Sequence, residues 1–155
     1  MPSTSSYSFR DISASISGPG GTLQLASGIG TADEGISFEK AEDRNTMTPC
    51  ADGYVMHSLH AARAGLVRVR LLKTSVTNGL MMDLFKATGT TARTWGAHVI
   101  SLEDRVRGEK VVASRVAFSG EPALMYGKQG NVHEWTFHAG HIESSLGKGQ
   151  RTSSQ

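Results

Sequence analysis

The alternation of apolar and polar residues is clearest between Leu66 and Leu72. Its valines and Leu71 share one face of an extended strand, whereas Arg68 and Arg70 share the other face. The apolar spacing then becomes helical. Two hydroxyl residues suited to a helix start come first, and apolar residues follow at intervals of about one turn: Thr74 and Ser75, then Val76, Leu80, Met81, Leu84 and Phe85. The pattern predicts a strand followed by a helix that covers a sheet.

The period of two predicts further strands on both sides of this helix. Before it lie residues 7–10, 12–16, 22–25 and 35–39, with a tight turn at Gly18–Gly21; after it lie residues 95–102, 111–118, 123–126 and 132–142. Trp135 and Phe137 share the core face of the last strand, and Trp95 falls on a core face as well. The fold class is therefore mainly β: a β-sandwich or barrel with one flanking α-helix and a long protruding loop.

Residues 44–60 follow neither period, so we expect a long irregular loop there. Several apolar side chains, Met47 and Tyr54 among them, lie on this segment, which a fully solvated loop would not need. Two interpretations remain open. The loop either folds over its own core or forms an arm that docks on another copy of the chain.

The length and composition limit the possible classes of protein. A chain of 155 residues fits a single domain, 1–155, and its small polar ends, 1–6 and 147–155, are expected to be flexible. The formal net charge is +2 and no basic block is present, which argues against an electrostatic nucleic-acid surface. Cys50 is the single cysteine, so no intrachain disulfide can form. No apolar run is long enough for a membrane segment.

No motif for catalysis or metal binding survives inspection. His138 and His141 lie three residues apart in a predicted strand, where odd separations point to opposite faces. No serine lies in a Gly-x-Ser-x-Gly elbow, and Cys50 has no recognisable assisting motif. We therefore expect no enzyme, no catalytic residue, no metal and no cofactor.

Several short stretches, in their order and spacing, resemble the tail-tube proteins of contractile-tailed (myovirus) bacteriophages. They are Gly35-Ile36, Glu42-Asp43 with Asn45-Thr46-Met47, Gly53 with His57-Ser58, Val69 to Ser75, and Glu134 to Phe137. The resemblance covers about Tyr7 to Leu146, and its motifs are structural rather than catalytic. The chain departs from the family pattern at Val76, where we would expect proline, and at Cys50, which leaves a thiol role between chains open.

The resemblance implies a structural, self-assembling subunit of the virion tail. Hexameric rings would stack into a tube through which phage DNA passes without specific binding during ejection. The implied partners are the tail sheath, tape-measure, baseplate and tail-terminator proteins, and assembly would take place in the host cytoplasm. Mixed charge suits such a channel, because every phosphate neutralised by Lys or Arg would strengthen DNA binding.

We expect the arm, Asp43 to His57, to form the contact between rings, with Met47 and Tyr54 as its anchors. The candidate inter-ring and inter-subunit residues are Asp43, Arg44, Asn45, Met47, Cys50, Asp52, Tyr54, His57, Arg68 and Arg70. We expect the two arginines to meet a neighbouring subunit or an acidic partner rather than DNA. The alternative is a small monomeric β-barrel that binds single-stranded nucleic acid, which requires aromatic residues on an exposed face.

Overall fold

The computed structural model describes residues 12–26, 35–89, 93–122, 128 and 132–147. Nine strands and one helix occur within these ranges. In chain order they are β1 (Ile12–Gly18), β2 (Gly21–Ala26), β3 (Ile36–Lys40), β4 (Asn45–Pro49), β5 (Val55–Leu59), β6 (Gly65–Leu72), α1 (Thr77–Thr88), β7 (His98–Asp104), β8 (Glu109–Phe118) and β9 (Val132–Ser145). The expected mainly-β fold with one helix is confirmed.

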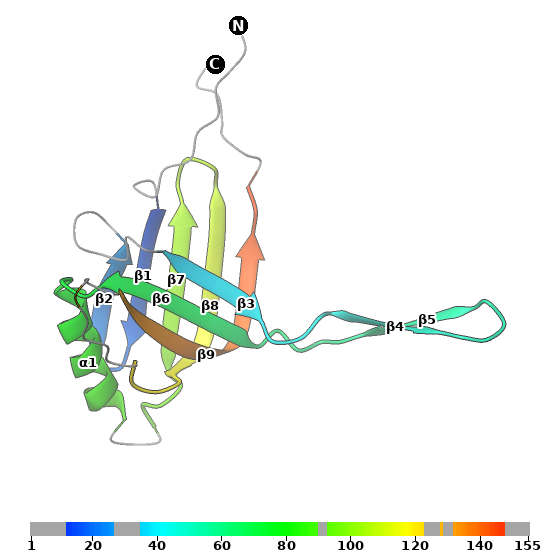
Figure 1. The fold of residues 1–155 in the computed structure, drawn as a ribbon. Helices are drawn as coiled ribbons and strands as arrows, with labels where there is room; N and C mark the ends of the chain where they lie inside the picture. Colours follow the sequence, from blue (N-terminus) through cyan, green and yellow to red (C-terminus); the bar gives the residue numbers. More distant parts are fainter. Residues whose placement is uncertain (1–11, 27–34, 90–92, 123–127, 129–131, 148–155) are drawn as a thin grey trace, which may run out of the picture.

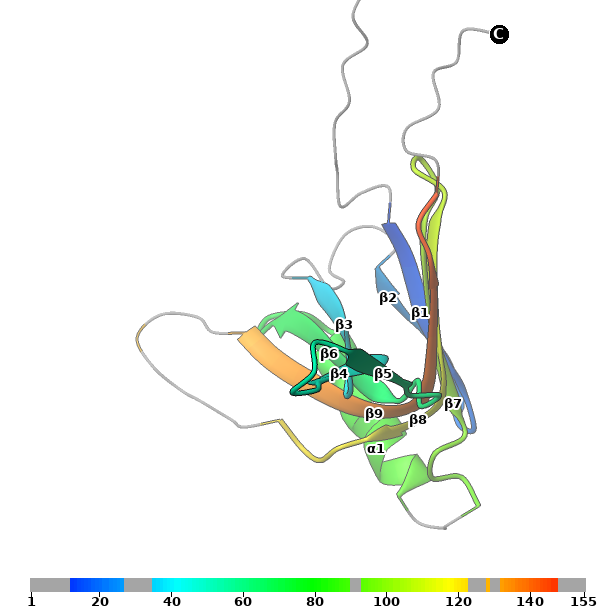
Figure 2. The same cartoon turned by 90° about the vertical axis from the view of Figure 1, so that its right-hand side faces the viewer.

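Seven strands form one antiparallel sheet in the order β2-β1-β7-β8-β9-β6-β3, and β4 and β5 form a separate pair. The long strand β9 belongs to both halves of the large sheet: its first part, Val132–Ala139, pairs with β6, and its second part, Phe137–Ser145, pairs with β8. The sheet bends along β9, so that β3 and β6 run across the direction of β1, β7 and β8 (Figures 1 and 2).

A β-bulge in β8 accompanies this bend. Opposite β7, the register passes from Ile100↔Ala113 to His98↔Val116, so two residues of β8 oppose one residue of β7. Arg115 is one of the two. Among the described residues it is the non-glycine residue with a positive φ, at 52°. Bulges increase strand twist and change strand direction. The bulge thus helps the two halves of the sheet to enclose one core.

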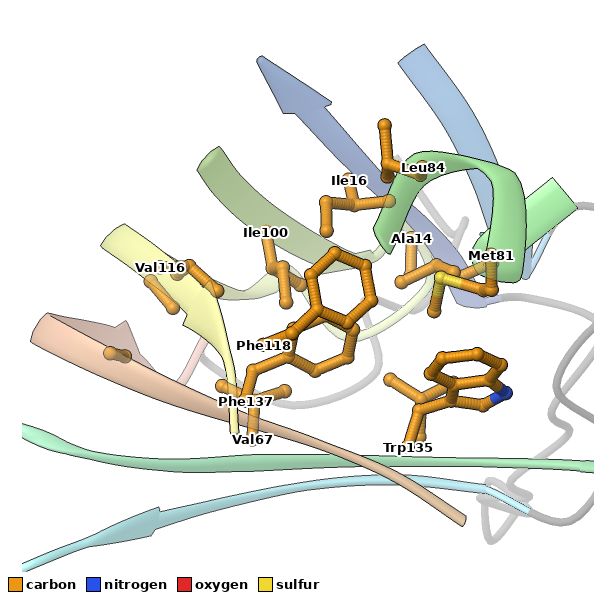
Figure 3. Packing of buried hydrophobic residues seen from close by; sticks show 14 of the residues in the cluster. Ala14, Ile16, Val67, Met81, Leu84, Ile100, Val116, Phe118, Trp135 and Phe137 are labelled. Carbon is orange, nitrogen blue, oxygen red and sulfur yellow. The ribbon is translucent and has the colours of Figure 1, made fainter. Parts of the chain in front are cut away.

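The core lies inside the bend, where α1 meets the sheet (Figure 3). Phe118 is at its centre and contacts the rings of Phe85, Trp135 and Phe137 at centroid distances of 5.3, 5.9 and 4.7 Å. Met81 and Leu84 of α1 face this cluster. The predicted core positions of Trp135 and Phe137 are confirmed, because both are buried.

The predicted helix is confirmed with shifted ends and a shifted face. One of the two expected hydroxyls meets a helix N–H, since the Thr77 N–H donates to the hydroxyl of Ser75 over 3.3 Å, but the N-cap residue is Val76 and makes no side-chain cap hydrogen bond. Its buried residues, however, are Thr77, Met81, Leu84 and Thr88. Val76 and Leu80, which the pattern placed in the core, are exposed. The apolar residues thus form two stripes on this helix. The stripe of Met81 and Leu84 meets the sheet, and the stripe of Val76 and Leu80 does not.

Two predictions from the pattern are wrong. Trp95 was placed on the core face of a strand, but β7 begins at His98, and Trp95 lies in a turn with 41% of its surface exposed, where its ring packs edge-on against Phe85. Residues 44–60 were expected to be irregular, but they form the hairpin β4–β5. The predicted strands at 7–10 and 123–126 and the flexible ends 1–6 and 147–155, apart from Gly147, lie outside the described residues.

Candidate assembly surface

The hairpin β4–β5 projects from the sheet as a continuation of the β3–β6 pair (Figure 1). Backbone hydrogen bonds link the two elements: the Ala41 N–H donates to the Ala64 carbonyl, and the His60 N–H donates to the Arg44 carbonyl. Residues 41–57 are all exposed. The interpretation of this segment as a loop folded over its own core is therefore wrong, and the segment reaches away from the molecule.

A three-residue loop closes the hairpin. The Cys50 N–H donates to the Tyr54 carbonyl over 2.8 Å, and the Gly53 N–H donates to the Cys50 carbonyl over 3.2 Å. Gly53 has a φ of +89°, a conformation that glycine adopts without steric cost. The dipeptide Asp52-Gly53 is a sequence signal for a β-hairpin turn, because such turns need a residue with positive φ. The prediction of an irregular loop did not take it into account.

The register divides the hairpin into two unlike faces. Asn45 lies opposite Leu59, Met47 opposite His57, and Pro49 opposite Val55, so these six side chains share one face. Four of them are apolar, and we call them the apolar hairpin face: Met47, Pro49, Val55 and Leu59. The other face carries Thr46, Thr48, Met56 and Ser58. An apolar stripe on a two-stranded hairpin that covers no core is a surface for a partner.

Each face also holds one hydrogen bond between side chains in the half of the hairpin nearer the sheet. The Asn45 amide nitrogen lies 2.9 Å from Nδ1 of His57, and the Thr46 hydroxyl lies 2.7 Å from Nε2 of His60. Both pairs join β4 to β5 or to the residue after it. They brace the part of the hairpin that is closest to its attachment.

The structure brings eight of the ten candidate residues together on this arm. Asp43 and Arg44 lie at its root, Asn45, Met47 and His57 on its strands, and Cys50, Asp52 and Tyr54 at its tip. Tyr54 is 75% exposed, and the Cys50 thiol is free and exposed. Pro49, Val55 and Leu59 belong to the same surface but are not among the ten candidates; the alternation of apolar residues on both sides of Asp52-Gly53 could have added them.

Arg68 and Arg70 lie elsewhere, on the outer face of β6. Arg68 pairs with Glu39 of β3 at 2.8 Å and with Glu134 of β9 at 3.7 Å, while Arg70 donates to Glu134 over 2.9 Å. Two arginines and two glutamates thus form one compensated row across three neighbouring strands. Such partly exposed pairs contribute little stability, but they leave this row of four side chains without net charge.

A basic cleft of about 450 Å³ lies beside the root of the hairpin. Four cationic residues from separate segments line it: Lys40, Arg44, Arg63 and Lys110. The acidic residue in the cleft, Glu143, lies 3.5 Å from Arg63 and 3.1 Å from His141. The excess of positive charge fits an acidic partner surface.

The described residues offer surfaces for association rather than a reaction centre. Among them, no group of three or more His, Cys, Asp or Glu side chains is arranged to hold a metal ion. No helix in the same ranges is long and apolar enough to cross a bilayer. Trp135 and Phe137 are buried, so they cannot form the exposed stacking platform that a single-stranded nucleic-acid binder needs.

An open-edged β-sheet that carries an exposed hairpin arm defines a building block of a larger assembly. The comparison with protein families identifies the block. The chain belongs to the family of the bacteriophage PhiTE tail tube protein, whose model matches residues 4–147. The protein is therefore a structural component of a phage tail, found in the virion, and not an enzyme. The comparison with curated proteins finds no match.

Solved structures of contractile injection systems share the fold. The chain matches a protein of the PVC sheath–tube complex in its extended state at 10% identity and a TM-score of 0.52, over 86% of this chain and 88% of the other. It matches the tube-terminating cap of the anti-feeding prophage (AFP) at 9% identity and a TM-score of 0.52, over 94% of each chain. The PVC sheath/tube terminator matches at 10% identity and 0.50, over 86% and 93%.

Proposed function

We propose that this chain is the repeating subunit of a tail tube in which hexameric rings stack around a channel for DNA ejection. The observation that carries the proposal is the hairpin β4–β5, an arm with an apolar face that covers nothing in its own chain. A single such contact is weak, but a ring repeats it on every subunit, and repetition gives avidity. The arm thus forms the contact between one ring and the next.

The open edges of the sheet support the ring itself. Within the described residues, β2 pairs only with β1, and β3 pairs only with β6, so each outer strand leaves a row of backbone N–H and C=O groups without a strand partner. Exposed edges invite pairing with another chain. Pairing of the edges of neighbouring subunits joins their sheets into one continuous barrel around the channel.

The ten candidate residues divide between these two contacts. Asp43, Arg44, Asn45, Met47, Cys50, Asp52, Tyr54 and His57 contact the adjacent ring through the arm. Arg68 and Arg70 contact a neighbouring subunit in the same ring, next to the edge strand β3. Arg70 keeps about half of its side chain exposed, and its guanidinium has five N–H donors, so it can bind a second carboxylate besides Glu134.

The charge distribution suits a channel that DNA must leave. The formal net charge is only +2, and Arg68 and Arg70 already pair with Glu39 and Glu134, so they do not offer free cations to phosphate. Each contact between an unpaired Lys or Arg side chain and a DNA phosphate would strengthen DNA binding and slow the passage of DNA. Phage DNA therefore slides through without specific binding.

The family and the similar structures support part of the set of partners. Two of those structures carry the names of a sheath–tube complex and a sheath/tube terminator, which supports a tail sheath and a tail terminator as partners here. A tape-measure protein inside the tube and a baseplate at its end complete the set. Assembly takes place in the host cytoplasm before the tail becomes part of the virion.

The hairpin can be tested by substitution, because its side chains support no core. Leu59→Lys places a charge on the apolar hairpin face, whereas Thr48→Lys places the same charge on the opposite face of the same hairpin. Both variants should keep the circular dichroism of the parent. Negative-stain microscopy of concentrated protein, with the tape-measure protein added, should show tubes for the parent and Thr48→Lys, and unstacked rings for Leu59→Lys. Normal tubes from Leu59→Lys, or a parent that stays monomeric, would contradict the proposal.

A further inference from the structure

The exposed large hydrophobic side chains of the described chain gather in two places. Five lie on the hairpin: Met47, Tyr54, Val55, Met56 and Leu59. Four lie where β6 ends and α1 begins, and we call them the distal strip: Leu72, Val76, Leu80 and Val132. Of the remaining members of this set, Trp95 packs against Phe85, and Leu146 is near the end of β9. The two clusters are thus separate surfaces without cover.

The members of the distal strip come from three elements that meet at one end of the molecule. Leu72 of β6 lies opposite Val132 of β9 in the sheet register. The Ser75 N–H donates to the Leu72 carbonyl and turns the chain, which brings Val76 to the start of α1. Leu80 follows Val76 one helical turn later, on the same side of the helix. Val76 is 79% exposed.

The helix does not use this stripe to hold itself on the sheet. Its buried side chains are two threonines, Met81 and Leu84, while Val76 and Leu80 point away from the core. This aliphatic stripe lies outside the buried core, and Leu80 also lines a hollow with Leu23 and Leu84. It is a surface that a partner can cover.

The distal strip and the hairpin lie at opposite ends of the same strand pair. The hairpin leaves the sheet where β3 ends and β6 begins (Figure 1), and the distal strip includes Leu72, the last residue of β6, and Val132, the first residue of β9. The eight residues of β6 separate the two ends by about 25 Å. The hairpin of one copy therefore cannot reach its own strip, but it can reach the strip of a second copy in line with it.

We propose that the distal strip is the receiving surface for the apolar hairpin face of a second copy of this chain. This inference rests on the proposed function and names the two surfaces of the ring-to-ring contact. Each subunit then gives a hairpin at one end and receives one at the other. Such a heterologous contact leaves a free surface at both ends of every complex, which is the geometry of an open stack rather than of a closed dimer.

The charges at the two ends favour the same arrangement. The hairpin end carries the basic cleft of Lys40, Arg44, Arg63 and Lys110. The distal end has a hollow beside Val132 whose lining includes two carboxylates: Glu121, and Glu134, which already pairs with Arg68 and Arg70. In a head-to-tail stack the basic end of one copy faces Glu121 of the next. Complementary charge at the rim guides the two surfaces into register.

The strip is tested by charges placed on it alone. Val76→Glu and Leu80→Glu change exposed positions at the start of α1, and Lys86→Glu, an exposed position on a different side of the same helix, is the control. The control should form tubes like the parent. Both strip variants should form rings that do not stack, with circular dichroism unchanged; two independent positions keep the test valid if one variant fails to fold.

A mixing experiment separates this inference from the proposed function. Leu59→Lys retains the strip, and Val76→Glu retains the hairpin, so neither should stack alone, but an equal mixture should give joined pairs of rings and nothing longer. Stacking by both strip variants while Leu59→Lys fails to stack would overturn the strip and leave the hairpin contact standing. An equal mixture that gives no joined rings would also overturn the strip as the receiving surface. Tubes formed by Leu59→Lys without a partner variant would contradict the proposed function itself.

Discussion

The indole Nε1 of Trp135 donates a hydrogen bond to the side-chain oxygen of Asn78 over 3.1 Å. Trp135 lies in β9 and is 1% exposed, while Asn78 lies in the first turn of α1. The amide nitrogen of the same Asn78 donates to the Leu72 carbonyl at the end of β6 over 2.8 Å. One side chain thus fixes the start of the helix to two strands, at the end of the molecule that carries the distal strip.

Substitution of Asn78 with alanine is predicted to destabilise the fold. The Trp135 N–H would remain buried without an acceptor, and such a group costs about 1–3 kcal/mol. The Leu72 carbonyl would lose its side-chain donor as well. Urea denaturation followed by tryptophan fluorescence measures the free energy of unfolding, and an unchanged midpoint for Asn78→Ala would contradict the role assigned to this bond.

Asn78→Asp separates the two halves of this contact. The carboxylate keeps an acceptor for Trp135 but loses the donor to Leu72, and a negative charge near a helix N-terminus is favourable. Its loss of stability should therefore be clearly smaller than that of Asn78→Ala. Equal losses for the two variants would show that the Leu72 bond, and not the Trp135 bond, carries the effect.

His98 is predicted to make the fold sensitive to acid. The residue is buried in β7 beside the ring of Phe118, and burial lowers its pKa in the folded chain. In the unfolded chain a histidine has a pKa of about 6.5. Below that pH the unfolded state binds a proton that the folded state does not bind, so the free energy of unfolding falls as the pH falls.

The histidine itself can be isolated by a pair of variants. His98→Asn removes the titrating group from the core, whereas His138→Asn removes an exposed imidazole from β9. Denaturation at a series of pH values should give His98→Asn a flatter slope between about pH 7 and pH 5 than the slopes of the parent and of His138→Asn. Parallel curves for all three proteins would assign the acid sensitivity to other groups.

Sequence patterns located the elements that bury one face. β6, the helix and β9 were found because their apolar residues follow a period set by contact with the core, and Trp135 and Phe137 were placed correctly for the same reason. The helix face was assigned incorrectly, because Val76 and Leu80 are as apolar as Met81 and Leu84. A period shows that two residues share a face, but it does not tell which of two apolar faces meets the sheet.

The hairpin was missed for a related reason. Its strands bury neither face within this chain, so a search for a core-facing stripe did not detect Met47, Pro49, Val55 and Leu59 as one surface. The candidate residues on the arm were found through the family resemblance and through apolar side chains in a segment without apparent order. The partners of Arg68 and Arg70 depend on a register between three strands, which no local pattern contains.

Asp104 is predicted to stabilise the turn between β7 and β8. Burial alone would raise the pKa of its carboxyl, but the N–H groups of Arg107 and Val106 and the Arg107 guanidinium outweigh it and hold the pKa below its usual value. Asp104→Ala should cost about 2 kcal/mol at neutral pH. The contribution of a carboxylate with a lowered pKa is lost as the pH falls below about 4, so parent and variant should converge in acid.

The exposed Asp83 of α1 is the control for this turn. Asp83→Ala removes the same charge without a described hydrogen bond to the fold, and its effect on the free energy of unfolding should stay within about 0.5 kcal/mol. Chemical denaturation at neutral and acidic pH compares the three proteins. If Asp104→Ala lowers the free energy of unfolding no more than Asp83→Ala does, Asp104 does not stabilise the turn.

Gly65 is predicted to control how the hairpin is attached. A Cβ atom at this position would clash with the Glu39 carbonyl of β3 and lie 2.7 Å from Cδ1 of Ile142, so Gly65→Ala must push β3 away from β6 at the root of the arm. Such overpacking costs about 1–3 kcal/mol. Gly79→Ala is the matched change in α1, where a Cβ meets nothing within 4 Å, and it should stabilise the protein by about 0.5–1 kcal/mol. Because the displaced strands carry the arm, Gly65→Ala should also give fewer stacked rings in negative-stain micrographs, and Gly79→Ala should not. A Gly65→Ala protein with the stability and the tubes of the parent would show that the backbone at this position yields freely.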